Sequence, residues 1–186
     1  MGNIIDIRDA VPHPLKDLST FLELTSDTIG HFSLQDNDIS EEFINWLAKY
    51  RVEIKLAEVF YCAPGAEVPV HSDDIEPVGC CKLSWAFGKT AVPMEWYEVQ
   101  QGTELFYKNN SIGGYYLTCS PEHYSLSEIG YINNPSLVRV DILHGVRNLT
   151  HTPWWCLCIV PRKINGSHHR ITWDEALEIF KEVING

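Results

Sequence analysis

The sequence predicts a mainly β protein with flanking helices, and three observations support that prediction. The central region, from about residue 53 to residue 162, shows little helical periodicity. It consists of short segments, rich in β-branched and aromatic residues, that Gly, Pro, Asn and Asp separate, which is typical of an antiparallel sandwich or barrel. Both flanks instead carry apolar residues at helical spacing. We therefore expect a core of about eight strands with helices packed outside it.

The strand-like segments follow one another closely along the chain. The first covers residues 53–63, and a turn at Pro64-Gly65 leads into the second, EVPVHSD. The others, in order, are CCKLSWAF, VPMEWYEV, ELFYK, GGYYLTC, SLVRVDI, HGVRNL and WWCLCIV. Substrate specificity in such folds resides in loops at the open end of the core, which we expect at residues 74–80, 88–92 and 108–114.

Helix signals mark the two ends. The stretch Asp38-Ile39-Ser40 offers cap candidates for a helix over SEEFINWLAKY, whose apolar residues form roughly one stripe. Near the other end, Thr172 with Glu175 three residues later predicts a capping box. We expect residues 1–186 to form a single domain, with a mainly helical N-terminal part over 1–52, a β core over 53–162 and a C-terminal helix over 172–184.

The formal net charge of −11 makes nucleic acid an unlikely general partner, because acidic chains repel phosphate backbones. The sequence has no signal-peptide pattern and no apolar stretch long enough to span a bilayer. We therefore expect a cytoplasmic protein without a membrane partner, whose six cysteines are reduced thiols. The oligomeric state is not indicated.

The stretch VPVHSDD, residues 68–74, contains a pair of candidate metal ligands. Side chains alternate along a strand, so His71 and Asp73 point to the same side, which favours Asp73 over Asp74. Two histidines and a carboxylate on one face of an octahedron form the facial triad of non-haem iron(II) oxygenases. His144 is the candidate third ligand, because it follows an apolar strand and leads into another. Alternatively, the His-x-Asp pair arose by chance and His144 is a polar residue at a strand edge.

Together these stretches resemble the iron(II)/2-oxoglutarate-dependent dioxygenase superfamily over about residues 59–162. The segments that carry the resemblance are VFYCAPGAEVPVHSDD, KLSWAFGKTAVPMEWYE and SLVRVDILHGVRNLTHTPWWCLCIVPR. They look most similar to the aspartyl/asparaginyl hydroxylase-like branch and to small putative phage or marine bacterial members. The resemblance implies a double-stranded β-helix, a relative of the jelly roll and the cupins, with His71, Asp73 and His144 as iron ligands and no catalytic side chain beyond them.

The resemblance also implies an activity. Members bind 2-oxoglutarate to the iron, split O₂, release succinate and CO₂, and hydroxylate an unactivated C–H bond. The expected cofactors are therefore Fe(II) and 2-oxoglutarate, and the expected partners are O₂ and a small-molecule, amino-acid or peptide substrate. Two alternatives stay open: a cupin-like metal-binding protein that does not use 2-oxoglutarate, and a non-enzymatic β-sandwich interaction domain.

One position departs from the family pattern. Members hold the far carboxylate of 2-oxoglutarate with Arg or Lys on the last strand, and here that position is Trp154, which cannot pair with a carboxylate. Lys82 is the first substitute, on the same strand face as Ser84. Arg162 shares a face with Trp154, and Arg147 follows His144.

Other residues have weaker expected roles at the site. Tyr61 is a candidate co-substrate contact, and Trp85 and Trp96 are expected in the core or the pocket wall. Cys80, Cys81, Cys156 and Cys158 are expected as buried thiols rather than as a zinc site.

Overall fold

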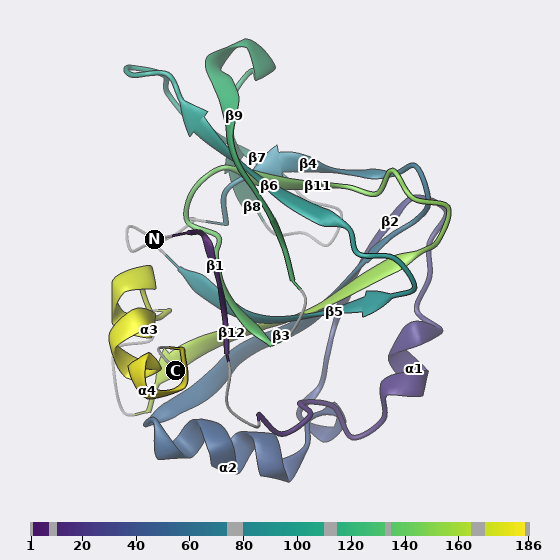
Figure 1. Cartoon of the computed structure of the whole chain (residues 1–186), viewed down its shortest axis with the longest axis vertical. Coiled ribbons are helices and arrows are strands. Elements are labelled where there is room, and N and C mark those ends of the chain that lie inside the picture. The colour runs from purple at the N-terminus through teal and green to yellow at the C-terminus, as the bar shows by residue number, and fades with distance from the viewer. Residues whose placement is uncertain are drawn as a thin grey trace.

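A computed structural model of the chain describes residues 2–7, 11–73, 80–109, 115–132, 135–164 and 170–184. Two antiparallel sheets face each other in it, and helices cover the outer side of the larger one (Figure 1). The larger sheet has the order β1 (Ile4–Asp6), β10 (Ser136–Arg139), β5 (Cys81–Gly88), β12 (Trp154–Lys163), β3 (Val52–Cys62), β2 (Ile29–Ser33). The smaller sheet has the order β4 (Glu67–His71), β11 (His144–Arg147), β6 (Pro93–Val99), β9 (Tyr124–Tyr131).

Eight of these strands pair as a long hairpin that is folded back on itself. β6 pairs with β9, and moving outward along the chain β5 pairs with β10, β4 with β11 and β3 with β12. Successive pairs alternate between the two sheets, which is the topology of a double-stranded β-helix or jelly roll. The predicted fold class, mainly β with flanking helices and a cupin-like jelly roll, is confirmed.

Alternation along the strands builds two apolar cores. On β12, Leu157 and Ile159 face the helices, whereas Cys156 and Cys158 face the smaller sheet. The first core therefore lies between the larger sheet and the helices, and the second lies between the two sheets. The second core gives way at one end of the β-helix to a cleft that holds the polar residues described below.

The helices begin where the sequence predicts caps. Ser40 accepts a hydrogen bond from the backbone N–H of Phe43 at the start of α2 (Glu41–Lys49). Thr172 and Glu175 form the expected capping box at the start of α3 (Trp173–Ile179), and a short α4 (Lys181–Ile184) follows. The remaining helical elements are α1 (Leu18–Leu22) and two 3-10 turns at Asp36–Asp38 and Pro121–His123.

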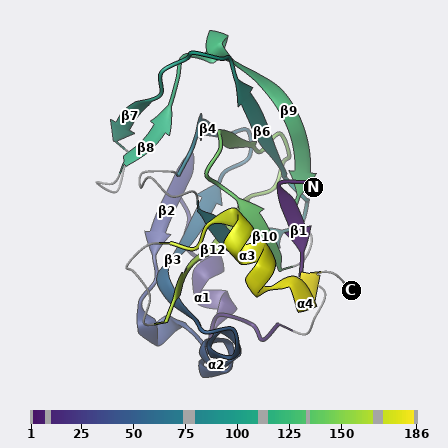
Figure 2. The same cartoon turned by 90° about the vertical axis from the view of Figure 1, so that its left-hand side faces the viewer.

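A two-stranded hairpin of β7 (Phe106–Asn109) and β8 (Tyr115–Thr118) stands apart from both sheets (Figure 2). It is tied to the end of β4 by a bridge between Ser72 and Leu117, whose backbone groups exchange two hydrogen bonds. The hairpin thus lies beside the end of the strand that carries His71.

Three elements differ from the sequence-based expectation. The N-terminal part, expected to be mainly helical over 1–52, also supplies β1 and β2 as edge strands, since short edge strands lack the continuous apolar pattern of central ones. The C-terminal helix is interrupted at Phe180, whose φ of −100° and ψ of 12° separate α3 from α4. Strand β9 was not predicted, because its Ser and Glu residues and largely exposed side chains resemble a loop.

No helix in the described parts of the chain is long and apolar enough to cross a membrane. Of the loops expected to control specificity, residues 74–79 and 110–114 lie outside the described residues, as does Asp74.

Candidate metal centre

Strand β4 positions the first two candidate ligands. It begins after the Pro64-Gly65 turn, where Gly65 adopts a φ of 75° that favours glycine. Its far end is fixed from both sides, since Ser72 pairs with Leu117 and the backbone N–H of Asp73 donates to the carbonyl of Val140. His71 and Asp73 therefore project from a segment held by backbone hydrogen bonds.

The third candidate lies directly opposite. His144 begins β11 and is the Cα partner of His71 in the antiparallel ladder between β4 and β11. The ladder shifts register between His144 and Val146, because β4 contains an extra residue near Pro69. A Cβ on Gly145 would meet the Val68 carbonyl oxygen at 3.3 Å, so glycine allows the close approach of β11 to this bulge.

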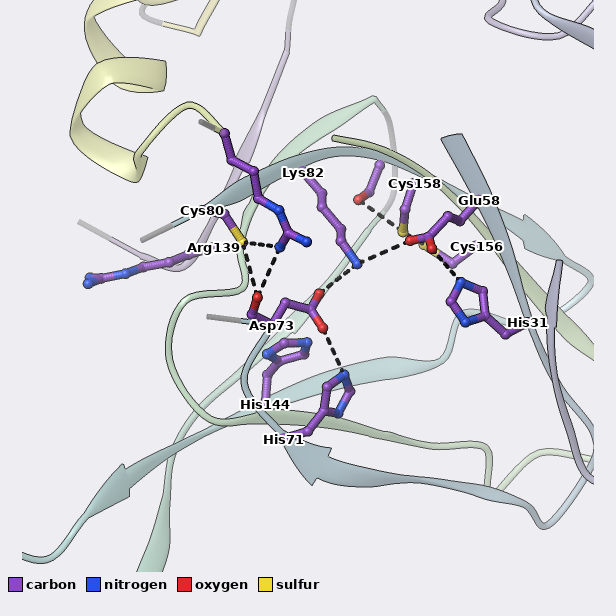
Figure 3. A network of polar contacts seen from close by, with 12 residues as sticks. His31, Glu58, His71, Asp73, Cys80, Lys82, Arg139, His144, Cys156 and Cys158 are labelled. Carbon is purple, nitrogen blue, oxygen red and sulfur yellow. Dashed lines mark hydrogen bonds and ion pairs between the residues drawn. The ribbon is translucent and has the colours of Figure 1, made fainter. Parts of the chain in front are cut away.

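The ligand atoms of His71, Asp73 and His144 all lie within 4.8 Å of one another. The His71 Nε2 atom is 3.4 Å from Asp73 Oδ1, and the centroids of the two imidazole rings are 4.5 Å apart. Figure 3 shows the two rings on one side of the Asp73 carboxylate. The structure thus brings together two imidazoles and one carboxylate from β4 and β11.

Backbone carbonyls select the same tautomer in both histidines. The Nδ1 atom of His71 lies 2.7 Å from the carbonyl of Pro69, and Nδ1 of His144 lies 2.9 Å from that of Ile142. A carbonyl can only accept, so Nδ1–H is the donor in each contact and Nε2 keeps its lone pair. Ligating histidines are typically oriented by such a hydrogen bond.

The electrostatics of the three residues suit a cation. Burial, with a smaller contribution from His71, lowers the pKa of His144 to about 3, so its imidazole is neutral at pH 7. Burial raises the pKa of Asp73, but Lys82 and His71 outweigh it and hold that pKa well below its ordinary value. A neutral imidazole and an ionised carboxylate are the forms that bind metals.

These observations test whether the residues fit a metal ion. Two nitrogen donors and one oxygen donor suit iron(II) and related divalent metals, and three donors on one side leave other coordination positions open. The residues therefore fit such an ion through His71 Nε2, His144 Nε2 and an oxygen of Asp73. Metal binding itself stays a prediction.

The site opens into a cleft of about 360 Å³. Its walls combine His71 and Asp73 with His31 and Glu58, and they include aromatic rings from Phe60 and from the β7–β8 hairpin. The hairpin residue Tyr116 lies edge-on to His71, with ring centroids 5.5 Å apart. His144 lines a smaller cavity of about 50 Å³ deeper between the sheets, so a metal here would lie between the cleft and the core.

Glu58 and His31 are polar residues of this cleft that sequence reasoning did not identify. The His31 Nε2 atom lies 2.7 Å from Glu58 Oε1, and the His31 ring stacks on Phe60. Burial raises the pKa of Glu58, but the hydrogen bond from His31 and the charge of Lys82 leave it below its ordinary value. The available signal was a charged residue, Glu58, between the apolar residues Ala57 and Val59 of β3. His31 lies on β2, within the part of the chain that the sequence predicts to be mainly helical.

The co-substrate candidates take different places. Lys82 is buried in the cleft wall, with Nζ 2.6 Å from Asp73 Oδ2 and 3.8 Å from Glu58 Oε2. Ser84 lines the small inner cavity, where its hydroxyl is 3.6 Å from Cys158 Sγ. Tyr61 alternates with Phe60 and packs its ring against Trp155 on the helix side of the sheet. Tyr61 is nevertheless among the residues that line the cleft, so its contact with a co-substrate stays a prediction.

Two arginines lie away from the ligands. Arg162 has the strand parity that the sequence suggests, but it lies near the far end of β12, where its Nε donates to Glu53 at 2.8 Å. Arg147 binds Glu95 on the other face of β11. Neither is among the residues that line the cleft.

The residue at the usual anchor position, Trp154, is buried and lines the inner cavity, and its indole N–H has no hydrogen-bond partner among the described residues. Trp85 on β5 belongs to the core between the larger sheet and the helices, and Trp96 on β6 belongs to the core between the two sheets. All six cysteines are buried free thiols.

No protein-family model matches this sequence, and no curated protein matches it. Several solved structures are similar in fold, and three of them are described here. The TT1209 protein from Thermus thermophilus has 15% identity and a TM-score of 0.39, covering 79% of this chain and 97% of that one. An RmlC-like cupin protein from Desulfovibrio desulfuricans has 14% identity and a TM-score of 0.35, with coverages of 74% and 91%. EvdO2 from Micromonospora carbonacea, complexed with 2-oxoglutarate, has 15% identity and a TM-score of 0.38, with coverages of 75% and 70%. The fold assignment rests on the strand pairing itself.

Proposed function

We propose that this chain is a non-haem iron(II) oxygenase that uses 2-oxoglutarate to hydroxylate a small molecule, an amino acid or a peptide side chain. We also propose that it belongs with the aspartyl/asparaginyl hydroxylase-like or small phage and marine bacterial branch that its sequence resembles. The observation that carries the proposal is the meeting of two correctly oriented imidazoles and an ionised carboxylate at a cleft.

The chain's own residues would act mainly by orienting the metal ligands and by excluding water from the metal ion. The carbonyls of Pro69 and Ile142 fix the Nε2 lone pairs of the two histidines toward the ion. The apolar lining, which includes Phe60 and Val68, limits water around it. When bound, iron(II) would supply the activation of O₂, which no amino-acid side chain provides.

A 2-oxoglutarate molecule needs open metal positions and a cation for its far carboxylate. The described residues that line the cleft include two permanent cations, Lys82 and Arg170. Lys82 already faces the carboxylates of Asp73 and Glu58. Our candidate for the anchor is Arg170, because its guanidinium lies in the same region, where Nη1 donates to the Asp73 carbonyl at 2.9 Å and to Cys80 Sγ at 3.4 Å.

The engagement of Lys82 also favours a second candidate function. A cupin-like, metal-dependent enzyme without 2-oxoglutarate would need the same three ligands but no cation reserved for a dicarboxylate. In that case Arg170 would fix the backbone at Asp73 rather than bind a co-substrate.

Calorimetry on anaerobic, iron(II)-loaded protein separates the two candidates. Titration with 2-oxoglutarate is expected to show saturable binding that Arg170→Ala weakens by at least tenfold. Lys163→Ala is a matched control, because Lys163 is a half-exposed cation paired with Glu175 outside the cleft. Iron affinity is measured in each variant, so that loss of the metal is not mistaken for loss of the co-substrate.

No heat of binding at millimolar 2-oxoglutarate, with iron bound, would reject the first candidate in favour of the second. Failure of the wild-type protein to bind iron(II), zinc or manganese would reject both, and would favour a non-enzymatic interaction domain.

A further inference from the structure

Lys82 occupies an unusual position for a co-substrate anchor. Its ammonium lies between the carboxylates of Asp73 and Glu58, at 2.6 Å and 3.8 Å, and 4.9 Å above the centre of the Phe60 ring. Figure 3 shows the resulting chain of contacts, from His71 through Asp73, Lys82 and Glu58 to His31. The side chain is buried, so both ion pairs are formed away from bulk water.

The two carboxylate oxygens of Asp73 have different surroundings. Oδ1 faces the histidines, 3.4 Å from His71 Nε2. Oδ2 is buried, and apart from the Lys82 ammonium it has no donor among the described residues. A carboxylate can bind a cation through one oxygen or through both. Lys82 therefore holds the oxygen that would otherwise be available as a second ligand.

We infer that Lys82 is a positioning residue that keeps Asp73 monodentate and so preserves one open coordination position on the metal. This inference rests on the metal site of the proposed function. An octahedral ion with three protein donors keeps about three positions for water or reactants, whereas a bidentate Asp73 would leave about two. The role of Lys82 is thus to protect a coordination position rather than to bind a co-substrate carboxylate.

Glu58 is the second carboxylate beside the ammonium. Its Oε2 atom lies 3.8 Å from Lys82 Nζ, farther away than Asp73 Oδ2 at 2.6 Å. Glu58 is in turn fixed by the hydrogen bond to His31 between β2 and β3. The shorter contact to Asp73 Oδ2 is therefore the one that positions the ammonium, and Glu58 is a more distant neighbour.

Removal of Lys82 should change the geometry of the metal site more than its affinity. Without the ammonium, Asp73 and Glu58 would be two buried carboxylates without a counter-ion, which is costly. A divalent cation would relieve that cost by attracting both oxygens of Asp73. We therefore expect Lys82→Met to bind metal at least as tightly as the wild type, with one fewer coordinated water.

The experiment uses the full chain loaded with Mn(II), which reports water ligands through electron–nuclear double resonance in ¹⁷O-labelled water. Wild type is expected to show about three water ligands and Lys82→Met about two. Glu58→Gln is the matched control, because it removes a charge from the same cluster but leaves the contact between Lys82 and Asp73, so it should keep about three. The double variant Glu58→Gln/Lys82→Met also removes the Glu58 charge, so only one buried carboxylate, that of Asp73, is left without the ammonium. This variant carries the test if Lys82→Met does not fold.

The outcomes distinguish this inference from the proposed function. An equal number of water ligands in wild type and in the folded Lys82 variant, with Mn(II) bound in both, would overturn the inference and leave the metal site intact. A wild-type protein that binds no Mn(II) would overturn both.

Discussion

His71 and His144 are Cα partners across the β4–β11 ladder, and their imidazole rings lie 4.5 Å apart. The two residues come from distant parts of the sequence, yet each has its Nδ1 held by the carbonyl two residues earlier. This shared geometry makes them equivalent nitrogen donors for one metal ion.

Each of the two histidines, His71 and His144, should be essential for metal binding. Either substitution, His71→Ala or His144→Ala, leaves one imidazole and Asp73 as the only protein ligands of the three. Loss of a residue that merely hydrogen-bonds to a ligand weakens metal binding by roughly 10- to 100-fold, so loss of a ligand itself should weaken Mn(II) binding by more than that. Calorimetry with Mn(II) checks this, with His123→Ala as the control because that histidine is exposed on a 3-10 turn. Wild-type affinity in both cleft variants would show that the triad is wrong.

Glu58 should stabilise the fold in a pH-dependent manner. Its pKa in the folded protein is below the ordinary value of 4.5, so its contribution is complete above about pH 4.5 and is lost as the pH falls through the folded pKa. Glu58→Gln should therefore lower the free energy of unfolding at pH 7 by about 1 to 3 kcal/mol, since it removes a hydrogen-bonded charge. Urea denaturation of both proteins at several pH values checks the trend. A difference that stays constant from pH 7 to pH 3 would contradict the prediction.

Asn148 should be important for the turn between β11 and β12. It is fully buried, its amide donates to the carbonyls of Cys62 and Thr152, and its oxygen accepts from Thr150. Asn148→Ala leaves these groups without partners and should cost about 2 to 3 kcal/mol of unfolding free energy. The neighbouring Leu149→Ala is the control, because Leu149 is 75% exposed and should change stability by less than about 0.5 kcal/mol. Equal denaturation midpoints for the two variants would refute the assignment.

Arg162 should have no role at the site. Its ion pair with Glu53 is partly exposed and lies outside the cleft, so Arg162→Ala should cost less than about 1 kcal/mol and leave metal and 2-oxoglutarate binding unchanged. The measurement is calorimetry with both ligands on the variant and on wild type. A tenfold weaker affinity for 2-oxoglutarate in this variant would make Arg162 the anchor instead of Arg170.

The sequence predicts those parts of the fold whose residues are locally constrained. The apolar alternation of β3, β5 and β12, the Pro64-Gly65 turn and the capping box at Thr172 are local signals, and the structure contains each of them. Strand β9 and the edge strands β1 and β2 lack such signals, since pairing partners far away in the sequence determine them. They were therefore missed or assigned to helical or loop regions.

The same distinction applies to the site. His71 and Asp73 could be paired from strand alternation alone, whereas the contact of Lys82 with Asp73 and Glu58 depends on how β3, β4 and β5 converge. The family resemblance made Lys82 the first candidate for a carboxylate anchor, and nothing local in the sequence shows that two acidic side chains already face it. The pairing of His31 with Glu58 is equally invisible from spacing, since it joins β2 to β3.

The central claim is that one metal ion is bound by His71, Asp73 and His144, and crystallography of the iron-loaded protein with anomalous data at the iron edge tests it most directly. We predict a single anomalous peak at about 2.1 Å from Nε2 of both histidines and from one oxygen of Asp73, comparable to other metal–nitrogen and metal–oxygen bonds. An iron peak bound by other residues, or ordered triad side chains without a peak between them, would contradict the account.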